Sequence, residues 1–388
     1  MRVHQSRWTH AQGWLPPLAE SSQSAAQLVL VFGAPAALLR TEVVQPIRSL
    51  YPSAILFGCS TAGEILGTQV TDDSLVLTAV CFEHAQVRGA EVAMSSCVGS
   101  VQAGERLGEA LPHSLEAAEH SAEDPLIHVL LLSDGLTVNG SDLIRGLLSR
   151  LPEGVTVTGG LAGDGARFGE TLVFLADVPK SGSMAVVGLY GQRLKVGLGS
   201  MGGWDPFGPD RLITRSTGSV LLELDGRPAL ALYKQYLGEH AQGLPATGLL
   251  FPLSVRLKAD GAALVRTILA VDERQQSMTF AGDVPEGAYA RLAKANVERL
   301  VDGAIGAASI CRDSTGQAAS LALLISCVGR KLLLKQRVEE ELEGVAEIFG
   351  AQTPFTGFYS YGEIAPFGPG AACELHNQTM TITTFAES

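Results

Sequence analysis

Three short passages end in a glycine followed by an acidic residue, a pair that can present a carboxylate from a tight turn. They read GCSTAGE at 58–64, TGGLAGD at 158–164 and GFYSYGE at 357–363. A carboxylate in such a turn can hold an ammonium group, and an arginine can hold a carboxylate through two parallel hydrogen bonds. Glycine-acid pairs are also common strand-ending turns with no ligand. The candidate ligand-binding residues for a small polar metabolite such as an amino acid are Glu64, Asp164, Arg330, Tyr359 and Glu363.

Two cysteines could act as thiol nucleophiles. Cys59 and Cys327 would each need a histidine close in space, and a buried structural thiol is the simpler interpretation. The six cysteines show no C-x-x-C spacing and no H-E-x-x-H motif occurs, so a zinc site is not indicated. We therefore predict that the protein is not an enzyme, with a thiol hydrolase as the remaining alternative.

Three of the eight histidines stand near predicted strand or helix ends. His240 follows a helix-ending glycine and precedes the loop AQGLP, which could present an imidazole to a ligand. His376 comes just before the last strand, and His128 begins an apolar strand where a core position is favoured. The residues alone single out none of them as a metal ligand.

The stretch GLGSMG at 197–202 matches the dinucleotide-binding fingerprint by its letters. That fingerprint needs a helix beginning at the third glycine, so that backbone amides face the phosphates. Here the next residues, 203–209, contain two prolines and two further glycines. We therefore do not expect a nucleotide site.

Short apolar runs of strand length dominate the first half of the chain. They occupy 28–32, 54–57, 74–82, 87–94, 127–132, 155–158, 172–175, 184–190 and 194–198. Helical spacing of apolar residues predicts helices over 38–47, bent or ended by Pro46, and over 143–151, capped by Ser141.

The second half is predicted to contain three helices. They cover 229–237, ended by Gly238, 289–305, and 334–349, ended by Gly350. The acidic run 339–343 is expected to be the solvated face of the last helix, because Leu342 belongs to its apolar stripe.

The three glycine-acid passages recur within a larger pattern. Each follows a strongly apolar strand (LVLVF, IHVLLL or LALLIS) and a helical segment, and each precedes another β-rich run. The repeated order is strand, helix, strand, turn and strand. This predicts an α/β fold with mixed β-sheets flanked by helices and built from repeated strand-helix-strand-strand units.

Composition limits the partners and the compartment. Of 388 residues 46% are hydrophobic and 18% charged, against roughly 25% charged in average proteins. The net charge is −12 without a basic block, so nucleic acid and anionic membranes are poor partners. No signal-peptide pattern or run of about 18 apolar residues occurs, which predicts a cytoplasmic protein without membrane insertion and with free thiols.

Several of these motifs together resemble the FIST domain family. FGCSTAGEI and DDSLVLTAV resemble its N-terminal domain, and LDGRPALALYKQYLG, SCVGR, GFYSYGEIAPFG and NQTMTITTF resemble its C-terminal domain. The resemblance implies two sensory halves: an extension over 1–27, an N-terminal domain over 28–220 and a C-terminal domain over 221–388.

The FIST family is a bacterial sensory family, found beside or fused to histidine kinases, chemotaxis receptors and cyclic-dinucleotide enzymes. A chain of this size resembles the stand-alone nitric-oxide-sensing haemoproteins of the NosP type. That resemblance implies b-type haem, nitric oxide as the signal, and regulation of a partner sensor histidine kinase in two-component, biofilm-type control. The favoured axial ligand of that haem is His240, and the alternatives are His376 and, after it, His128. The alternative is a FIST sensor for a small metabolite, and a homodimer is compatible with both.

Overall fold

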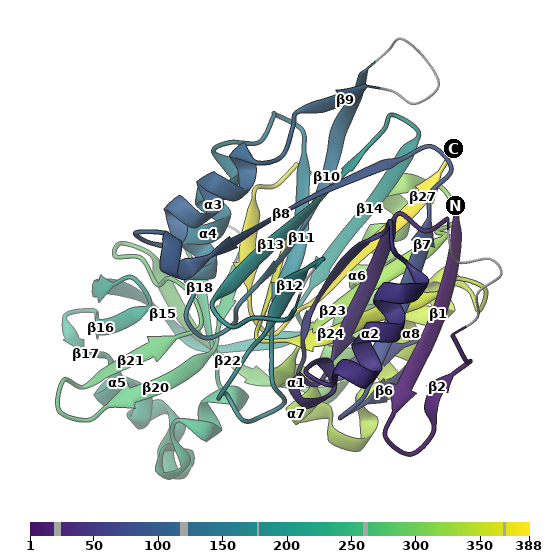
Figure 1. Cartoon of the computed structure of the whole chain (residues 1–388). Helices are drawn as coiled ribbons and strands as arrows, with labels where there is room; N and C mark the ends of the chain where they lie inside the picture. The colour runs from purple at the N-terminus through teal and green to yellow at the C-terminus, as the bar shows by residue number, and fades with distance from the viewer. Residues whose placement is uncertain (19–24, 117–122, 177, 259–262, 368–369) are drawn as a thin grey trace.

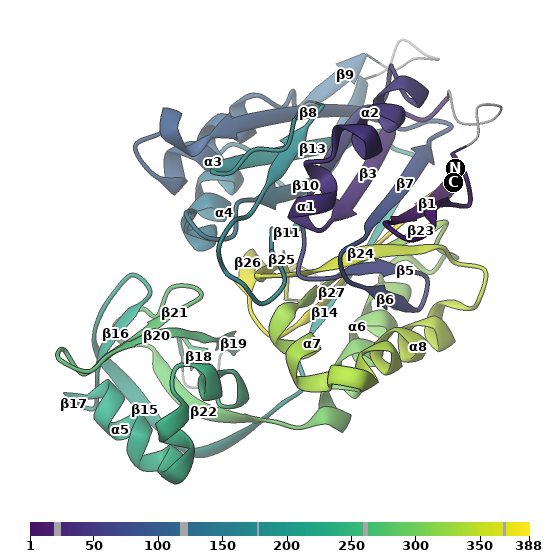
Figure 2. The ribbon, with the colours of Figure 1, turned by 60° about the horizontal axis from the view of Figure 1, so that its bottom comes forward.

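The computed structural model describes residues 1–388 except 19–24, 117–122, 177, 259–262 and 368–369. The fold is mixed α/β, as predicted. Three sheets make up a main body, and a fourth forms a lobe to one side of it (Figures 1 and 2). No helix in the part of the chain that is described is long and apolar enough to cross a membrane.

The three sheets of the main body each contain strands from distant parts of the chain. The first has the order β12 (Val173–Leu175), β4 (Ile55–Ser60), β3 (Leu28–Gly33), β7 (Leu75–Cys81), β1 (Arg2–Thr9) and β2 (Gly13–Leu15). The second has β26 (Cys373–His376), β25 (Gly362–Pro366), β11 (Thr156–Leu161), β10 (Glu123–Ser133), β13 (Ser183–Tyr190) and β8 (Gln86–Ala93), with β9 (Ser114–Glu116) beside β10. The third has β14 (Leu194–Met201), β27 (Met380–Glu387), β23 (Leu321–Cys327), β24 (Phe355–Ser360), β5 (Glu64–Leu66) and β6 (Gln69–Thr71).

These sheets are three copies of one arrangement. Each has a parallel pair, namely β3 with β4, β10 with β11, and β23 with β24. The next long strand of the same repeat pairs antiparallel with the first member: β7, β13 or β27. This confirms the predicted repeat of strand, helix, strand, turn and strand, with one correction. The run TLVFLA at 171–176 contains the short strand β12, which pairs with β4, and the second repeat's counterpart of β7 and β27 is β13.

Each repeat also lends a short strand to a neighbouring repeat. β5 of the first repeat pairs with β24 of the third, β25 of the third pairs with β11 of the second, and β12 of the second pairs with β4 of the first. The exchange closes into a ring of three repeats. Residues on both sides of position 220 therefore share these sheets.

A glycine occupies the same place in the second strand of each repeat. The glycines and the residues opposite them are Gly58 and Val31, Gly159 and Leu131, and Gly357 and Leu324. A Cβ atom on these glycines would lie 2.0, 1.8 and 1.8 Å from the carbonyl oxygen opposite. The close approach of two backbones explains why the first or second residue of each passage is this glycine.

Helices cover the sheets, and four of them pack in pairs. The helices of the main body are α1 (Pro35–Leu38), α2 (Thr41–Leu50), α3 (Ser100–Glu109), α4 (Gly140–Leu148), α6 (Val297–Thr315), α7 (Val328–Leu334) and α8 (Val338–Phe349). α3 packs on α4 and α6 packs on α8. Short 3-10 helices span Met94–Ser96, Gly238–Gly243, Ala246–Leu250 and Lys335–Arg337.

The lobe is an insertion in the third repeat, between β14 and α6. It contains β15 (Trp204–Thr217), β16 (Val220–Leu224), β17 (Arg227–Pro228), α5 (Ala229–Leu237), β18 (Leu253–Arg256), β19 (Leu264–Arg266), β20 (Ile268–Asp272), β21 (Ser277–Phe280) and β22 (Tyr289–Ala295). Leu230, Leu253 and Phe280 belong to its own buried core. The lobe therefore has its own apolar interior, separate from that of the ring.

Most predicted strands and helix ends are confirmed, including Gly238 after α5 and Gly350 after α8. The helix predicted over 289–305 is wrong in its first part. Residues Tyr289–Ala295 form β22, which lies between β15 and β18, and α6 begins only after the cap Asn296. Tyr289 and Leu292 have helical spacing, but alternate burial of Ala290 and Leu292 shows that the strand period prevails.

Two local predictions about helix ends are also wrong. α2 continues through Pro46 to Leu50, since the proline removes only one backbone hydrogen bond of a helix that packs its apolar side on the core. α4 is capped by Asn139, whose side chain accepts a hydrogen bond from the Asp142 amide, and not by Ser141.

Candidate ligand cavity between the three repeats

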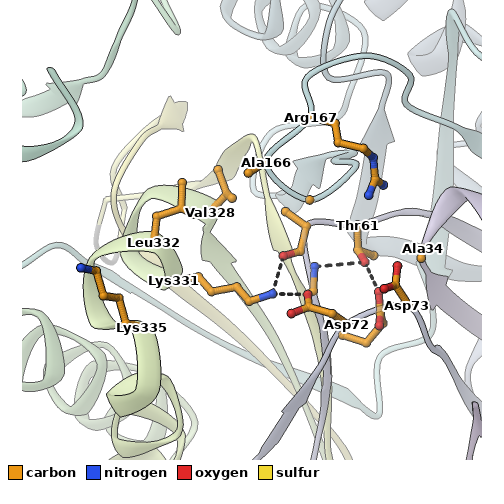
Figure 3. A pocket seen from close by; sticks show the side chains of 14 residues that line it. Ala34, Thr61, Asp72, Asp73, Ala166, Arg167, Val328, Lys331, Leu332 and Lys335 are labelled. Carbon is orange, nitrogen blue, oxygen red and sulfur yellow. Dashed lines mark hydrogen bonds and ion pairs between the residues drawn. The ribbon is translucent and has the colours of Figure 1, made fainter. Parts of the chain in front are cut away.

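A cavity of about 560 Å³ lies where the three repeats meet (Figure 3). The first repeat contributes residues 61–64 and 72–73, the second contributes 165–167, and the third contributes the side of α7. Residues 61–64, residues 165–167 and α7 follow the carboxyl ends of β4, β11 and β23, and residues 72–73 follow β6. Ligands of α/β proteins bind beyond the carboxyl ends of parallel strands, so this is the expected position for a binding site.

Lys331 of α7 joins the third repeat to the first across the cavity (Figure 3). Its ammonium group donates a 2.9 Å hydrogen bond to the carbonyl oxygen of Ala62 and forms an ion pair with Asp72. The same nitrogen lies 5.6 Å from the centre of the Tyr359 ring. With a side chain that is 17% exposed, Lys331 remains accessible to a ligand.

The cavity wall carries charges of both signs. Arg167 and Lys335 add two further cations, and Asp72 and Asp73 supply carboxylates. The side chains of Arg167 and Asp72 are 61% and 66% exposed. A small molecule with both an anionic and a cationic group would find partners for each here.

Glu64 lies at the cavity wall, but its carboxylate is hydrogen-bonded to residues of its own repeat. Its carboxylate accepts hydrogen bonds from Thr61 Oγ1 at 2.5 Å, and from the amide and hydroxyl of Ser74 at 3.1 and 2.6 Å. Burial raises the pKa of Glu64 to about 7, although these hydrogen bonds oppose the rise. Glu64 thus ties the turn after β4 to the start of β7.

Glu363 makes the same contacts in the third repeat. It accepts from Ser360 Oγ at 2.7 Å and from the amide and hydroxyl of Thr379 at 3.0 and 2.9 Å. Burial raises the pKa of Glu363 to about 7 as well. The glycine-acid passages of the first and third repeats are therefore equivalent clamps that close the exchanged hairpins.

Asp164 closes a different loop in the second repeat. It accepts hydrogen bonds from the amides of Phe168, Gly169 and Glu170 at 2.8, 2.9 and 3.0 Å, and from the Tyr361 hydroxyl. Burial alone would raise the pKa of Asp164, but these hydrogen bonds lower it overall. Asp164 holds the loop that brings residues 165–167 to the cavity.

Arg330 and Tyr359 are not brought to the cavity. Both are fully buried around Glu341. Arg330 donates to Glu341 through Nε at 3.1 Å and Nη2 at 2.7 Å, and Tyr359 donates through its hydroxyl at 2.7 Å. The arginine that the sequence offered for a ligand carboxylate already holds a carboxylate of the protein.

The solvated face predicted for residues 339–343 is therefore wrong at one position. Glu341 has no exposed surface, because α8 turns it, like the adjacent Leu342, toward the sheet. The role of Glu341 as the buried partner of Arg330 could not be recognised in a run of similar acidic residues. Only the burial of Arg330 reveals that an acid is needed there.

The three candidate haem ligands differ in their surroundings. His128 is buried between Thr156 Oγ1 and Thr158 Oγ1, at 2.7 and 3.0 Å from its ring nitrogens, and burial lowers its pKa to about 3. His376 is buried and donates from Nε2 to the carbonyl oxygen of Ala365 at 2.9 Å, and burial lowers its pKa to about 4. Neither fits an iron ligand, since each ring is packed in the main body.

His240 is exposed on the lobe, with its ring centre 5.2 Å from that of Phe251. Of the three histidines, this one alone could reach an iron without dismantling the core. Among the described residues, no group of three or more histidines, cysteines and acids could hold a metal ion.

The remaining sequence candidates lie inside the fold. Cys59 and Cys327 are buried, and burial raises the pKa of each thiol well above its ordinary value, which disfavours a nucleophilic thiolate. Residues 197–202 lie within or just beyond β14, which pairs along its length with β27. They form no phosphate-binding loop.

Comparison with known proteins gives two domain matches. The FIST N domain matches residues 27–227 and the FIST C domain matches residues 229–366. An uncharacterised protein of Mycobacterium tuberculosis is 28% identical over 276 residues, 66% of this chain and 68% of its own. One from Mycobacterium bovis is 30% identical over 273 residues, 66% of this chain and 67% of its own. One from Methanocaldococcus jannaschii is 25% identical over 211 residues, 50% of this chain and 40% of its own.

Proposed function

Because this chain belongs to the FIST family of sensory proteins, we propose that it senses a small metabolite in the cavity between its three repeats. One observation carries the proposal: loops from the carboxyl ends of strands in all three repeats line a single cavity. A ligand there would contact every unit of the ring at once. Binding can then change how the repeats sit against one another, which is what a sensor has to report.

The ligand class follows from the charges. A carboxylate would pair with Lys331 and Arg167, and an ammonium group would pair with Asp72. An amino acid carries both groups. Because Lys331 is already held by Asp72 and by the Ala62 carbonyl, a ligand carboxylate would compete for the link between the third and first repeats.

The output of this sensor is a second protein. We propose a sensor histidine kinase, in keeping with the FIST resemblance. The change at α7 would be carried by Arg330, the residue beside Lys331, which is tied through Glu341 to α8 at the surface of the main body.

Calorimetric titration of the twenty amino acids tests the proposal. When the free amino acid is present at a concentration 100 times its dissociation constant, its binding is expected to raise the free energy of unfolding by about 2.7 kcal/mol. Lys331→Gln is expected to weaken that binding about tenfold or more, as for loss of a charged hydrogen-bond donor. Lys195→Gln, at an exposed lysine of β14, is the matched control and is expected to bind normally. If no amino acid binds, or both variants bind equally, the proposal fails.

Haem-based sensing of nitric oxide is a second proposal, and it rests on the NosP-type resemblance. The favouring observation is the exposed imidazole of His240 beside Phe251. Haem would supply an iron that takes nitric oxide as a ligand. His240 would supply the protein's own donor nitrogen, and Phe251 and the half-buried Tyr236 would supply apolar contact.

Spectroscopic haem titration tests this second proposal. One haem per chain is expected to give a sharp Soret band, and His240→Ala is expected to shift or abolish it. His10→Ala, at another exposed histidine, should leave the band unchanged. A Soret band that never saturates, or one that His240→Ala leaves unchanged, would contradict the haem proposal.

A further inference from the structure

A second cavity, of about 610 Å³, lies where the lobe meets the ring. α4 of the second repeat contributes Ile144 and Leu148, the lobe contributes Leu264 and Arg266, and the hairpin of the third repeat contributes Phe367 and Cys373. None of its lining residues belongs to the cavity between the repeats. Its size lies within the range of small-molecule sites, roughly 300–1,000 Å³.

The rim of this second cavity exposes large apolar side chains. Leu257 is 69% exposed and Phe367 is 37% exposed, although both belong to the cavity wall. Ile144 behind them is 2% exposed. Apolar groups that gather at a cavity mouth favour a ligand with an apolar body.

The polar group at the back of the cavity is Arg266, which is 3% exposed. Its Nε donates to the carbonyl oxygen of Asp283 at 2.9 Å, and its Nη1 donates to the carbonyl oxygens of Val265 and Leu375 at 3.3 and 2.9 Å. All of these acceptors are main-chain carbonyls. Among the described residues Nη2 makes no hydrogen bond, and no ion pair joins the guanidinium to a carboxylate.

A buried guanidinium without an ion pair is unusual, because burying a charge is costly unless an opposite charge accompanies it. Burial lowers the pKa of Arg266 to about 10, so the side chain remains charged at neutral pH. Glu374 and Asp283 act on the Arg266 charge without an ion pair to it, so an anion reaching the guanidinium would supply a directly bonded countercharge and an acceptor for Nη2.

The other charges around the cavity leave room for that anion. Arg145 pairs with Asp142 at 2.5 Å, and Asp283 accepts a hydrogen bond from Asn139 at 3.2 Å. Lys258 adds a positive charge. Glu374 and Asp283 also line the cavity, but with Arg145, Lys258 and Arg266 its described lining carries three basic and two acidic side chains.

We propose that this second cavity binds a small carboxylic acid with an aromatic or branched apolar body, its carboxylate on Arg266 and its body against Ile144, Leu148 and Phe367. Arg266 also joins the lobe to Leu375 of the third repeat. Such a ligand would therefore hold the lobe against the ring, at a place distinct from the amino acid site.

Phenylacetate and its uncharged counterpart phenylacetamide test the proposal by calorimetric titration at millimolar concentrations. Saturable binding of phenylacetate, one molecule per chain, is expected, with the amide about tenfold weaker or more because it lacks the charge. No saturable heat with phenylacetate, or equal binding of acid and amide, would overturn the proposal.

Two variants locate the site. Leu148→Trp fills the apolar part of the cavity and is expected to abolish phenylacetate binding, whereas Leu39→Trp, at a leucine that is 52% exposed on the ring, should have no effect. Arg266→Gln is expected to make acid and amide bind alike. If a folded Leu148→Trp variant binds phenylacetate normally, the proposal is overturned.

A cross-test separates this site from the cavity between the repeats. Phenylacetate binding is expected to be unchanged in Lys331→Gln, and amino acid binding unchanged in Leu148→Trp. Loss of phenylacetate binding in Lys331→Gln would instead place it in the cavity between the repeats and would contradict a second site.

Discussion

The turns of the first and third repeats have the same internal structure but different neighbours. In both, a glutamate accepts a hydrogen bond from the hydroxyl three residues upstream. It also accepts from the amide and hydroxyl of the residue just before the next long strand, Ser74 before β7 or Thr379 before β27. The turn that holds Glu64 faces α7 across an open cavity. The turn that holds Glu363 does not line this cavity, although β25 pairs with β11 and β26 just as β5 pairs with β24 and β6.

The difference separates the structural role of the repeated residues from the proposed binding role. The repeated residues build the hairpin clamp, which is a structural task common to both turns. The residues proposed to bind the ligand, above all Lys331 and Arg167, lie outside the repeated pattern. Equivalent substitutions at the clamps should therefore have similar effects in the two repeats, whereas substitutions at the cavity should not.

The largest matched effect is expected from Gly58→Ala and Gly357→Ala. A Cβ at either site would lie 2.0 or 1.8 Å from a backbone carbonyl oxygen, so the paired strands would have to separate. Each change should lower the free energy of unfolding by about 4 kcal/mol or more. Denaturant unfolding of both variants measures this, and a mild effect in one repeat alone would break the equivalence of the clamps.

A large and unmatched effect is expected when α7 is changed at neighbouring residues. Arg330→Met leaves Glu341 buried without its partner and should cost about 3–5 kcal/mol. Lys331→Met removes a partly exposed pair and should cost about 1 kcal/mol or less. Chemical denaturation of the two variants compares them, and similar losses would refute the division between core and cavity residues.

The two clamps should also share a pH dependence. Burial raises the pKa of Glu64 and of Glu363 from 4.5 to about 7, so between these values the folded protein retains protons that the unfolded chain has released. The free energy of unfolding should then fall as the pH rises from about 4.5 to 7, by on the order of 3 kcal/mol for each acid.

Glu64→Gln and Glu363→Gln test this dependence, because an amide resembles the protonated carboxyl group. Each variant is expected to flatten the decline by a similar amount when unfolding is followed at several pH values. A control, Glu339→Gln, changes an exposed acid of α8 and should retain the full decline. If only one of the two substitutions flattens the decline, the two clamps are equivalent in geometry but not in their titration.

The smallest effect is expected from removing one hydroxyl at each clamp. Thr61→Ala and Ser360→Ala each delete one donor to the glutamate and should cost about 1 kcal/mol. Only Thr61→Ala should also change amino acid affinity, because Thr61 lines the cavity. Equal changes of affinity in both variants would argue against this cavity as the binding site.

The sequence predicted the repeats and most strands because their apolar runs and glycine turns are local signals. It could not predict the exchange of β5, β12 and β25, which depends on pairing between distant segments. The assignment of Arg330 to a ligand shows the same limit. Its partner Glu341 lies in an acidic run whose buried member no local pattern distinguishes.

The candidate site was predicted in part for a related reason. Glu64 and the loop after Asp164 do border the cavity, because the glycine-acid turns follow the strands that point toward it. Lys331 and Arg167 carry no motif of their own. They become recognisable only when helix and loop are placed opposite the first turn.

Amide hydrogen exchange, measured with and without the amino acid that binds best, tests whether the three repeats share one sensing site. We expect slower exchange in segments of all three repeats around the cavity, namely residues 61–74, 165–167 and 328–335. Protection confined to a single repeat or to the lobe, or no protection at saturating ligand, would contradict a sensing site shared by the three repeats.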